Sequence, residues 1–192
     1  MDIRFLYDQA LDTLRKARKV LLVSHKKPDG DTLGSMLAFL GFCRAQQIPA
    51  DGFCMDKIPK QYWYMAESEA VKSDPALFST YDVIAFFDAG DLRVAGVAEY
   101  FAALAKKPLV MNFDHHATNE RFGTVNIVDV TASSTAEVVY RFLQHFHFEY
   151  DADVATCLLT GVLTDTGNLT NPATTESAFA TAADLLRHGG KI

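Results

Sequence analysis

The chain has 192 residues, of which 49% are hydrophobic and 22% charged, a composition typical of one ordered globular domain with a sizeable core. A net charge of −6 argues against a protein that holds nucleic acid on a broad basic surface, because phosphate contacts need clustered Lys and Arg side chains. Cys43, Cys54 and Cys157 lack C-x-x-C spacing, which argues against a disulfide framework or a zinc knuckle and favours a reducing, cytoplasmic setting.

Apolar periodicity predicts helices and strands that alternate along the chain. Residues 3–17 predict a charged amphipathic helix rather than a secretion signal, and no later stretch of about 20 apolar residues could span a membrane. Continuous apolar strands separated by helices predict an α/β domain of three layers, α/β/α, with a mostly parallel sheet. Strands are expected at residues 20–23, 50–55, 82–88, 108–113 and 124–130, and further helices at 33–46, 134–146, 152–164 and 175–187.

Ionisable side chains follow three of these strands and one helix. In an open parallel sheet, ligands bind beyond the carboxyl ends of the strands, so side chains that follow different strands are expected to meet in one pocket. A carboxylate just after the apolar face of helix 152–164 is expected to point into the same pocket. The residues concerned are His25, Asp29, Asp31, Asp88, Asp114, His115, His116 and Asp165.

Each of these residues also has an ordinary structural interpretation when it is taken alone. His25 could be a hydrogen-bonded histidine at a strand end, Asp29 and Asp31 could belong to a surface turn, and Asp165 could end a helix before Gly167. Their convergence on one edge favours a shared site, because buried acids and imidazoles need hydrogen bonds, neutralisation or a metal ion.

The donor types predict a particular metal chemistry. Carboxylates and imidazoles without thiolates suit Mn²⁺ or Mg²⁺ better than a soft ion. Four or more aspartates carry too much negative charge for one divalent ion. Two cations about 3.5–4 Å apart, bridged by a carboxylate, could generate hydroxide and clamp a phosphoryl oxygen. This arrangement indicates a phosphoester hydrolase.

The same residues, in this order, resemble the motifs of DHH-family phosphoesterases. The resemblance rests on H-x-x-P-D-x-D at 25–31 with Gly34-Ser35, the isolated Asp88, D-H-H-x-x-N at 114–119 and T-D-T-G at 164–167. It implies a catalytic domain with two manganese ions, bridged by Asp88, and His116 facing the scissile phosphate while Asp114 orients the histidines. The implied ligands are His25, Asp29 and Asp88 for one ion and Asp31, Asp88, His115 and Asp165 for the other.

The residue sequences of the first motif and of residues 128–140 resemble those of one branch of the family, the nano-RNases (oligoribonucleases) and pAp phosphatases. That branch implies short RNA, linear dinucleotides or adenosine 3′,5′-bisphosphate (pAp) as substrate. Two alternatives stay open: an inorganic pyrophosphatase of family II, and a non-catalytic module that binds metal or nucleotide. Because no ligand position of the motifs is visibly replaced, we favour the enzyme.

Three substrate contacts are also expected, at Asn119, Ser134 and Thr135. Residues 134–137 predict a capping box at a helix start, which could also offer hydroxyls and amides to a phosphate. For the aromatic residues 62–64 we favour a packing role over base stacking.

The domain expectation is that residues 1–192 form the catalytic domain. The glycine-rich, histidine-containing motif of the family's C-terminal substrate-binding domain is not recognisable up to Ile192, so that domain is expected to be absent. Homodimer formation is left open by the sequence.

Overall fold

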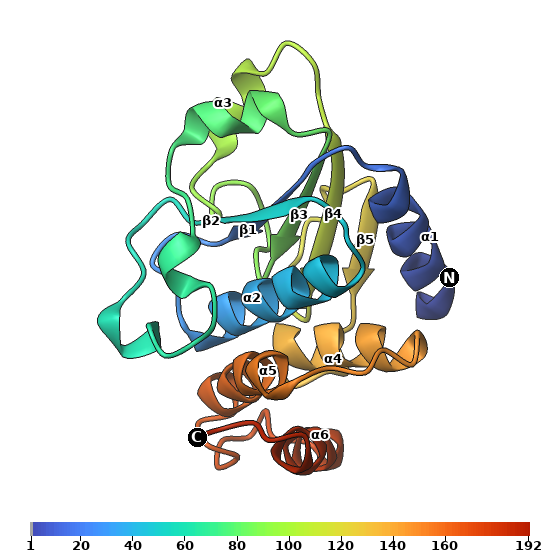
Figure 1. The fold of residues 1–192 in the computed structure, drawn as a ribbon, viewed down its shortest axis with the longest axis vertical. Coiled ribbons are helices and arrows are strands. Elements are labelled where there is room, and N and C mark those ends of the chain that lie inside the picture. The colour runs from blue at the N-terminus through green and yellow to red at the C-terminus, as the bar shows by residue number, and fades with distance from the viewer. Residues whose placement is uncertain (1) are drawn as a thin grey trace.

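In the computed structural model, residues 2–192 are described and form a five-stranded sheet with helices on both faces (Figure 1). The strand order is β2-β1-β3-β4-β5, and every neighbouring pair is parallel. This confirms the predicted α/β fold. The strands are β1 (Val20–Ser24), β2 (Ala50–Phe53), β3 (Val83–Phe87), β4 (Leu109–Asp114) and β5 (Val125–Val128). The helices are α1 (Ile3–Lys16), α2 (Gly30–Ala45), α3 (Ala98–Ala103), α4 (Thr135–His145), α5 (Ala152–Asp165) and α6 (Glu176–Arg187).

The sheet separates two apolar cores. On one face, side chains of the central strands pack against α1, α2 and α4, and Phe39 of α2 lies with its ring centroid 5.2 Å from that of Phe87 and 4.9 Å from that of Phe113. The other face packs against the segments around Phe78 and Val97. Helices α5 and α6 lie beyond α2 and α4, on the side away from the sheet (Figure 1). Strands β1 and β3 are therefore buried on both faces, which explains their continuous apolar sequences.

Helix α2 begins at Gly30, three residues earlier than the sequence pattern predicted. The Asp29 side chain caps this helix, because its Oδ1 accepts hydrogen bonds from the backbone N–H groups of Asp31 (3.0 Å) and Thr32 (3.1 Å). As a result, Asp31 lies in the first turn of a buried helix and is fully buried. The surface-turn interpretation of Asp31 is therefore wrong.

The β2–β3 connection contains three short 3-10 helices and the β3–β4 connection contains α3, none of which periodicity revealed. Helix α3 and the 3-10 helices span three to six residues each, too few to show a helical apolar repeat. After β2 the chain leaves the sheet and then returns along its edge, where the Lys72 N–H donates to the Gly52 carbonyl at 2.9 Å. The 3-10 helices are Lys60–Tyr62, Ser68–Ala70 and Pro75–Thr80.

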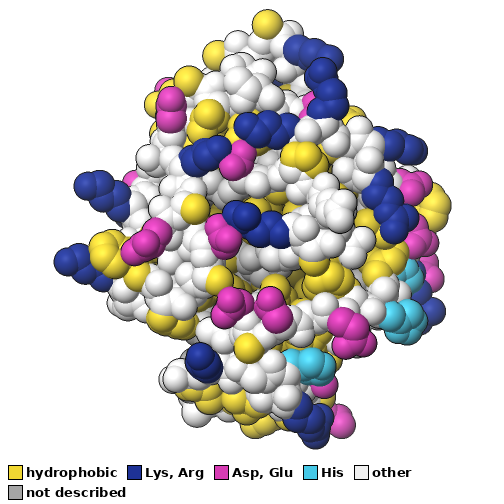
Figure 2. Space-filling model, in the orientation of Figure 1, with side chains coloured by type: hydrophobic (Ala, Val, Ile, Leu, Met, Phe, Trp, Pro, Cys, Tyr) yellow, Lys and Arg dark blue, Asp and Glu magenta, His cyan; other side chains and the backbone are white. Residues whose placement is uncertain are grey.

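Charged side chains of both signs are spread over the face of the molecule shown in Figure 2. This face has no continuous basic surface, as the net charge of −6 predicted. Within residues 2–192, no helix is both long enough and apolar enough to cross a lipid bilayer.

Glycines allow α5 to lie directly against α2. A Cβ atom on Gly34 would overlap the backbone carbonyl of Cys157, and one on Gly30 would overlap the Thr164 side chain. The two helices therefore approach closely, and this approach brings Asp165, the last residue of α5, beside the first turn of α2.

We predict that Gly34→Ala destabilises the protein by about 1–3 kcal/mol, because a backbone carbonyl cannot move aside as a flexible side chain can. This loss exceeds the gain of about 1 kcal/mol that alanine normally brings to a helix interior. Chemical denaturation measures the change in the free energy of unfolding. Gly52→Ala is the matched control, because its Cβ would meet only ordinary contacts at 3.5 Å. Equal stabilities of the two variants would contradict the close approach.

Candidate functional site

The carboxyl ends of β1, β3 and β4 place the predicted site residues side by side. In the sheet register Ser24 pairs with Phe87, and Phe87 pairs with Phe113. The residues that follow these strands therefore leave the sheet at one edge, and the start of α2 and the end of α5 add theirs. The structure brings all eight expected residues to this edge: His25, Asp29, Asp31, Asp88, Asp114, His115, His116 and Asp165.

Asp88 lies at the centre of this group. Its carboxylate oxygens lie 3.4 Å from Nε2 of His25, 3.8 Å from Nε2 of His115 and 3.5 Å from Nδ1 of His116. The Thr135 hydroxyl donates to the same carboxylate at 2.9 Å. The backbone of Asp88 is left-handed, with φ at 57°, a conformation that costs free energy for a residue with a side chain and that clusters at functional sites.

Three groups of donor atoms could hold a metal ion among the residues that the structure describes. In each group the donor atoms lie within 4.8 Å of one another. The first group is one of the two ligand sets that the family resemblance implied, and the second is the other set without Asp88. The groups are His25, Asp29 and Asp88; Asp31, His115 and Asp165; and Asp88, Asp114, His115 and His116.

His115 supplies a direct test of whether a metal ion fits. Its Nε2 atom is buried and has no hydrogen-bond partner among residues 2–192, although Oδ2 of Asp165 lies 3.3 Å away. A buried polar atom without a partner costs free energy, whereas an imidazole nitrogen surrounded by carboxylates is a suitable ligand for a divalent cation. The donor set therefore fits a hard or borderline metal ion.

Repulsion between carboxylates points to the same conclusion. Burial, followed by the negative charges of Asp88 and Asp165, raises the pKa of Asp31 well above its usual value. Burial also raises the pKa of Asp165, and the charge of Asp88 adds to this effect. A bound cation would reverse both effects, because it favours the charged form of each carboxylate.

The carboxylates around His25 favour its protonated form, which competes with a metal ion for the imidazole nitrogen. Burial by itself lowers the pKa of His25, but hydrogen bonds with Asp29 and Asp88 outweigh it and raise the pKa to about 10. The Nδ1 atom of His25 lies 2.7 Å from the Lys26 carbonyl oxygen, so Nε2 is the nitrogen that faces the carboxylates. Metal affinity at this site should therefore increase with pH.

Asp114 orients both histidines of the D-H-H sequence. Its Oδ1 accepts from the backbone N–H of His115 at 2.7 Å and from Nδ1 of His116 at 2.8 Å. This second hydrogen bond is the main cause that raises the pKa of His116 to about 9. Asn119 donates its side-chain amide to Asp114 and to Asn112, so the contacts of its side-chain amide are with the protein.

Ser134 and Thr135 are fully buried at the start of α4. The Ser134 hydroxyl caps the helix by accepting from the Glu137 N–H at 3.0 Å, and the Thr135 hydroxyl is bonded to Asp88. The amides of Thr135 and Ala136 donate to the carboxylate of Asp31 at 2.7 and 2.8 Å. The helix start therefore holds an anion of the protein itself. A substrate contact at Ser134 or Thr135 would require these groups to exchange partners.

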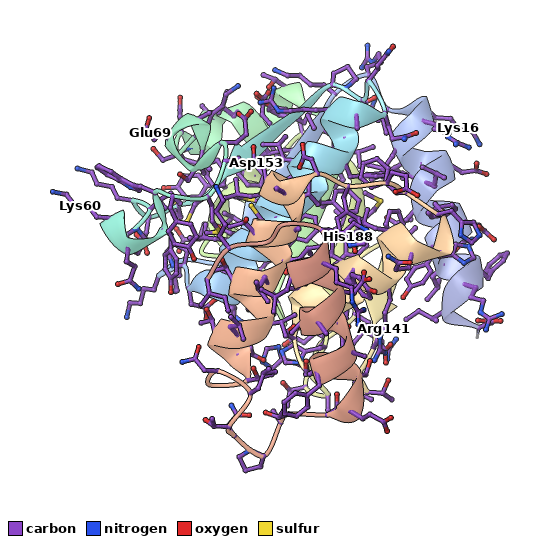
Figure 3. All side chains as sticks on the ribbon, turned by 60° about the horizontal axis from the view of Figure 1, so that its bottom comes forward. Lys16, Lys60, Glu69, Arg141, Asp153 and His188 are labelled. Carbon is purple, nitrogen blue, oxygen red and sulfur yellow. The ribbon has the colours of Figure 1, made fainter. Side chains whose placement is uncertain are left out.

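Glu137 belongs to a buried network that the sequence analysis interpreted only as a capping box. Its carboxylate accepts from the N–H and the hydroxyl of Ser133, both at 2.7 Å, rather than from the N–H of Ser134. It also pairs with Arg141 and bonds the hydroxyl of Ser177 on α6. Figure 3 shows Arg141 extending from α4 beside α6. The network fixes the turn from which α4 offers its amides to Asp31.

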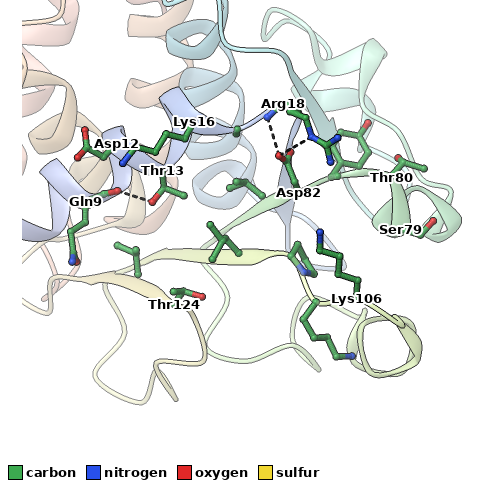
Figure 4. A pocket seen from close by; sticks show the side chains of 17 residues that line it. Gln9, Asp12, Thr13, Lys16, Arg18, Ser79, Thr80, Asp82, Lys106 and Thr124 are labelled. Atoms are coloured by element: carbon green, nitrogen blue, oxygen red, sulfur yellow. Dashed lines mark hydrogen bonds and ion pairs between the residues drawn. The ribbon is translucent and has the colours of Figure 1, made fainter.

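A hollow of about 810 Å³ lies at the opposite edge of the sheet (Figure 4). It is lined by the residues at the starts of β3 and β4. Two of its four cations have partners within the protein, since Arg18 pairs with Asp82 at 3.6 Å and Lys107 donates to the carbonyls of Phe101 and Ala102. Because the titratable cluster lies at the carboxyl edge, we place the functional site there and not in this hollow.

A family model and several curated proteins match this chain. The model of the DHH family, N-terminal domain, matches residues 19–162. The bifunctional oligoribonuclease and PAP phosphatase NrnA of Thermus thermophilus is 34% identical over 175 residues, which cover 90% of this chain and 51% of that protein. A probable manganese-dependent inorganic pyrophosphatase of Streptococcus mutans is 22% identical over 179 residues, 90% of this chain and 56% of that protein.

A solved structure shares the fold closely. The exopolyphosphatase-related protein of Bacteroides fragilis has a TM-score of 0.89 and 25% identity, and the match covers 98% of this chain and 58% of that one. The chain thus spans about half the length of the curated relatives that it matches.

We predict that Glu137→Gln lowers the free energy of unfolding at pH 7 by about 2 kcal/mol, because it weakens hydrogen bonds to a buried charged group. Burial raises the pKa of Glu137, but the hydrogen bonds from Ser177 and Ser133 outweigh this and lower it. The stabilisation is therefore present above about pH 4.3, the pKa of an unperturbed Glu, and is lost as pH falls through the lowered folded value.

Denaturation at several pH values tests this sign. The difference between wild type and Glu137→Gln should be constant near pH 7 and should narrow as pH falls below about 4.3. Glu149→Gln, at an exposed carboxylate, is the control and should leave stability unchanged at every pH. A difference that stays constant with pH would show that the charge of Glu137 does not carry the effect.

Proposed function

Because the chain belongs to the DHH family through the N-terminal domain of that family, we propose that it is a metal-dependent phosphoesterase that hydrolyses short oligoribonucleotides, linear dinucleotides or pAp. The family supplies the reaction class. The relative from Thermus thermophilus, named as an oligoribonuclease and PAP phosphatase, supports the substrate class.

The observation that carries the proposal is the buried Nε2 of His115, which lies among carboxylates and has no hydrogen-bond partner in the described part of the chain. Two Mn²⁺ ions, or Mg²⁺ in their place, suit this donor set. When bound, such ions lower the pKa of a water molecule and neutralise charge on phosphoryl oxygens. In our assignment His25, Asp29 and Asp88 hold one ion, and Asp31, Asp88, His115 and Asp165 hold the other.

His116 is assigned to the substrate. Its side chain is half exposed, whereas that of His115 is 13% exposed, and its Nδ1 is hydrogen-bonded to Asp114. The ring therefore directs its other nitrogen, Nε2, away from Asp114. With its pKa raised to about 9 by that hydrogen bond, His116 is cationic at neutral pH and can donate an N–H to a phosphoryl or leaving oxygen. Asp114 positions the ring and stabilises its charge.

A second candidate function has one specific observation in its favour. The relative from Streptococcus mutans is named as a manganese-dependent inorganic pyrophosphatase, and the same donor set would serve that reaction. The third alternative, a non-catalytic module that binds metal or nucleotide, predicts binding without turnover. The three alternatives differ in the products that they form from a common set of substrates.

We predict that Mn²⁺ restores most activity after treatment with chelator, that Mg²⁺ restores less, and that pApA and pAp are cleaved in preference to pyrophosphate. Chromatographic product analysis on pAp, pApA, longer RNA, cyclic dinucleotides and pyrophosphate measures this preference. Pyrophosphate as the best substrate would support the second candidate. Binding of metal and nucleotide without any product would identify a non-catalytic module.

We predict that Asp88→Asn loses metal while His116→Ala keeps it. Asp88 touches both predicted ligand sets, whereas His116 is assigned to the substrate side. Metal content measured after dialysis should fall in Asp88→Asn and match wild type in His116→Ala. The His116→Ala variant should lose about 10²–10⁴-fold in rate, as expected for a positioned acid or electrostatic group. Equal metal loss in the two variants would show that these roles are assigned wrongly.

A further inference from the structure

A second hollow, of about 590 Å³, lies in the segment that leaves β2 and returns along its edge. Its volume is within the range of sites for small molecules, about 300–1,000 Å³. Apolar surfaces of Ile58, Pro59 and Trp63 line it together with the side chains of Lys57 and Lys60. Figure 3 shows Lys60 extending from this part of the chain. The hollow thus combines a flat apolar wall with two cations, Lys57 and Lys60, and two carboxylates, Asp56 and Glu69.

Trp63, the only tryptophan of the chain, is held in place although its side chain is exposed. The residue is 50% exposed, and its indole N–H donates to the Ile58 carbonyl at 3.2 Å. The ammonium of Lys60 lies 5.8 Å from the ring centroid. An exposed ring in a fixed orientation loses little conformational freedom when a flat ligand stacks on it. Trp63 is therefore packed on one part of its surface, as the sequence favoured, and exposed on the rest.

Two residues that line this hollow contact the turn next to the candidate metal site. The Asp56 carboxylate accepts from the Lys27 N–H at 2.7 Å, and the Cys54 thiol lies 3.5 Å from the His25 carbonyl oxygen. Lys27 belongs to the turn between His25 and Asp29, so residues that line the hollow contact the turn that carries two of the predicted metal ligands. A ligand that reaches from the hollow across this turn would bring its next group to the metal site.

We infer that this hollow is a subsite for a nucleobase of the substrate, with Trp63 as the stacking surface and Lys57 and Lys60 beside a neighbouring phosphate. The inference rests on the proposed function and extends it, because it locates where a nucleotide is recognised away from the scissile bond. Bases stack on aromatic side chains with little dependence on sequence, and cations beside the ring attract the backbone of a single strand. Pyrophosphate has no base and would gain nothing from this hollow.

The single tryptophan allows a direct binding test on the wild-type protein. Adenosine 5′-monophosphate is titrated in the presence of chelator, and Trp63 emission is excited at the red edge, where adenine does not absorb. We expect a saturable change in emission. Ribose 5-phosphate, which carries the phosphate without the base, should cause none. No change with the nucleotide, or an equal change with both compounds, overturns the inference.

Kinetics with variants provide the second test. Trp63→Leu should raise KM for pApA by about 10-fold or more, with kcat within about 2-fold, and Trp63→Phe should recover part of the loss, because a smaller ring still stacks. Tyr100→Leu, at an aromatic residue of α3 that is 44% exposed, is the control and should behave as wild type. An unchanged KM in Trp63→Leu overturns the subsite even where pApA is hydrolysed.

The outcomes separate the subsite from the proposed function. If wild type hydrolyses none of the nucleotides, the proposed function fails, and the emission titration still decides whether a base binds beside Trp63. If Trp63→Leu does not fold, as judged by circular dichroism, that titration on wild type likewise decides the question.

Discussion

The fold holds several carboxylates close together at one edge of the sheet, and the rest of the site must compensate their mutual repulsion. Asp31, Asp88 and Asp165 lie close enough for the charge of one to raise the pKa of another, and Asp31 is fully buried. Such a cluster is costly unless cations or hydrogen-bond donors balance its charge. The rest of the site consists of such donors, provided by helix starts, threonine hydroxyls and imidazoles.

Helix starts perform much of this compensation. The start of α4 gives two backbone amides to Asp31, and the start of α2 receives one oxygen of Asp29, which leaves the other to face His25. Unpaired amides and the positive end of the helix dipole both favour a carboxylate at such positions. The amides of α4 are thus directed to a side chain of the protein, and the buried Glu137 network holds the preceding turn in place. These contacts arrange the carboxylates before any metal ion binds.

The two histidines of one local motif lie in different chemical environments. His115 and His116 are adjacent, yet the Nε2 of His115 is buried among carboxylates, whereas His116 is half exposed and bonded through Nδ1 to Asp114. A ring surrounded by carboxylates suits a metal ligand, and an exposed cationic ring suits contact with an anionic substrate. The curated relatives include nucleases and pyrophosphatases, which fits a metal centre that a shared fold provides and a specificity that other surfaces supply.

The sequence by itself determined the order of strands and helices and which chemical groups leave the sheet at its carboxyl edge. These features follow from apolar periodicity and from the rule for parallel sheets, so His25, Asp88 and His115 could be assigned to one place without coordinates. Only the tertiary structure decided that Asp31 accepts from the amides of α4, 104 residues away, and that Trp63 is exposed in a segment whose Asp56 contacts the turn after His25. The reason is physical: hydrogen-bond partners and exposure depend on how distant segments pack, and no local pattern of residues encodes that packing.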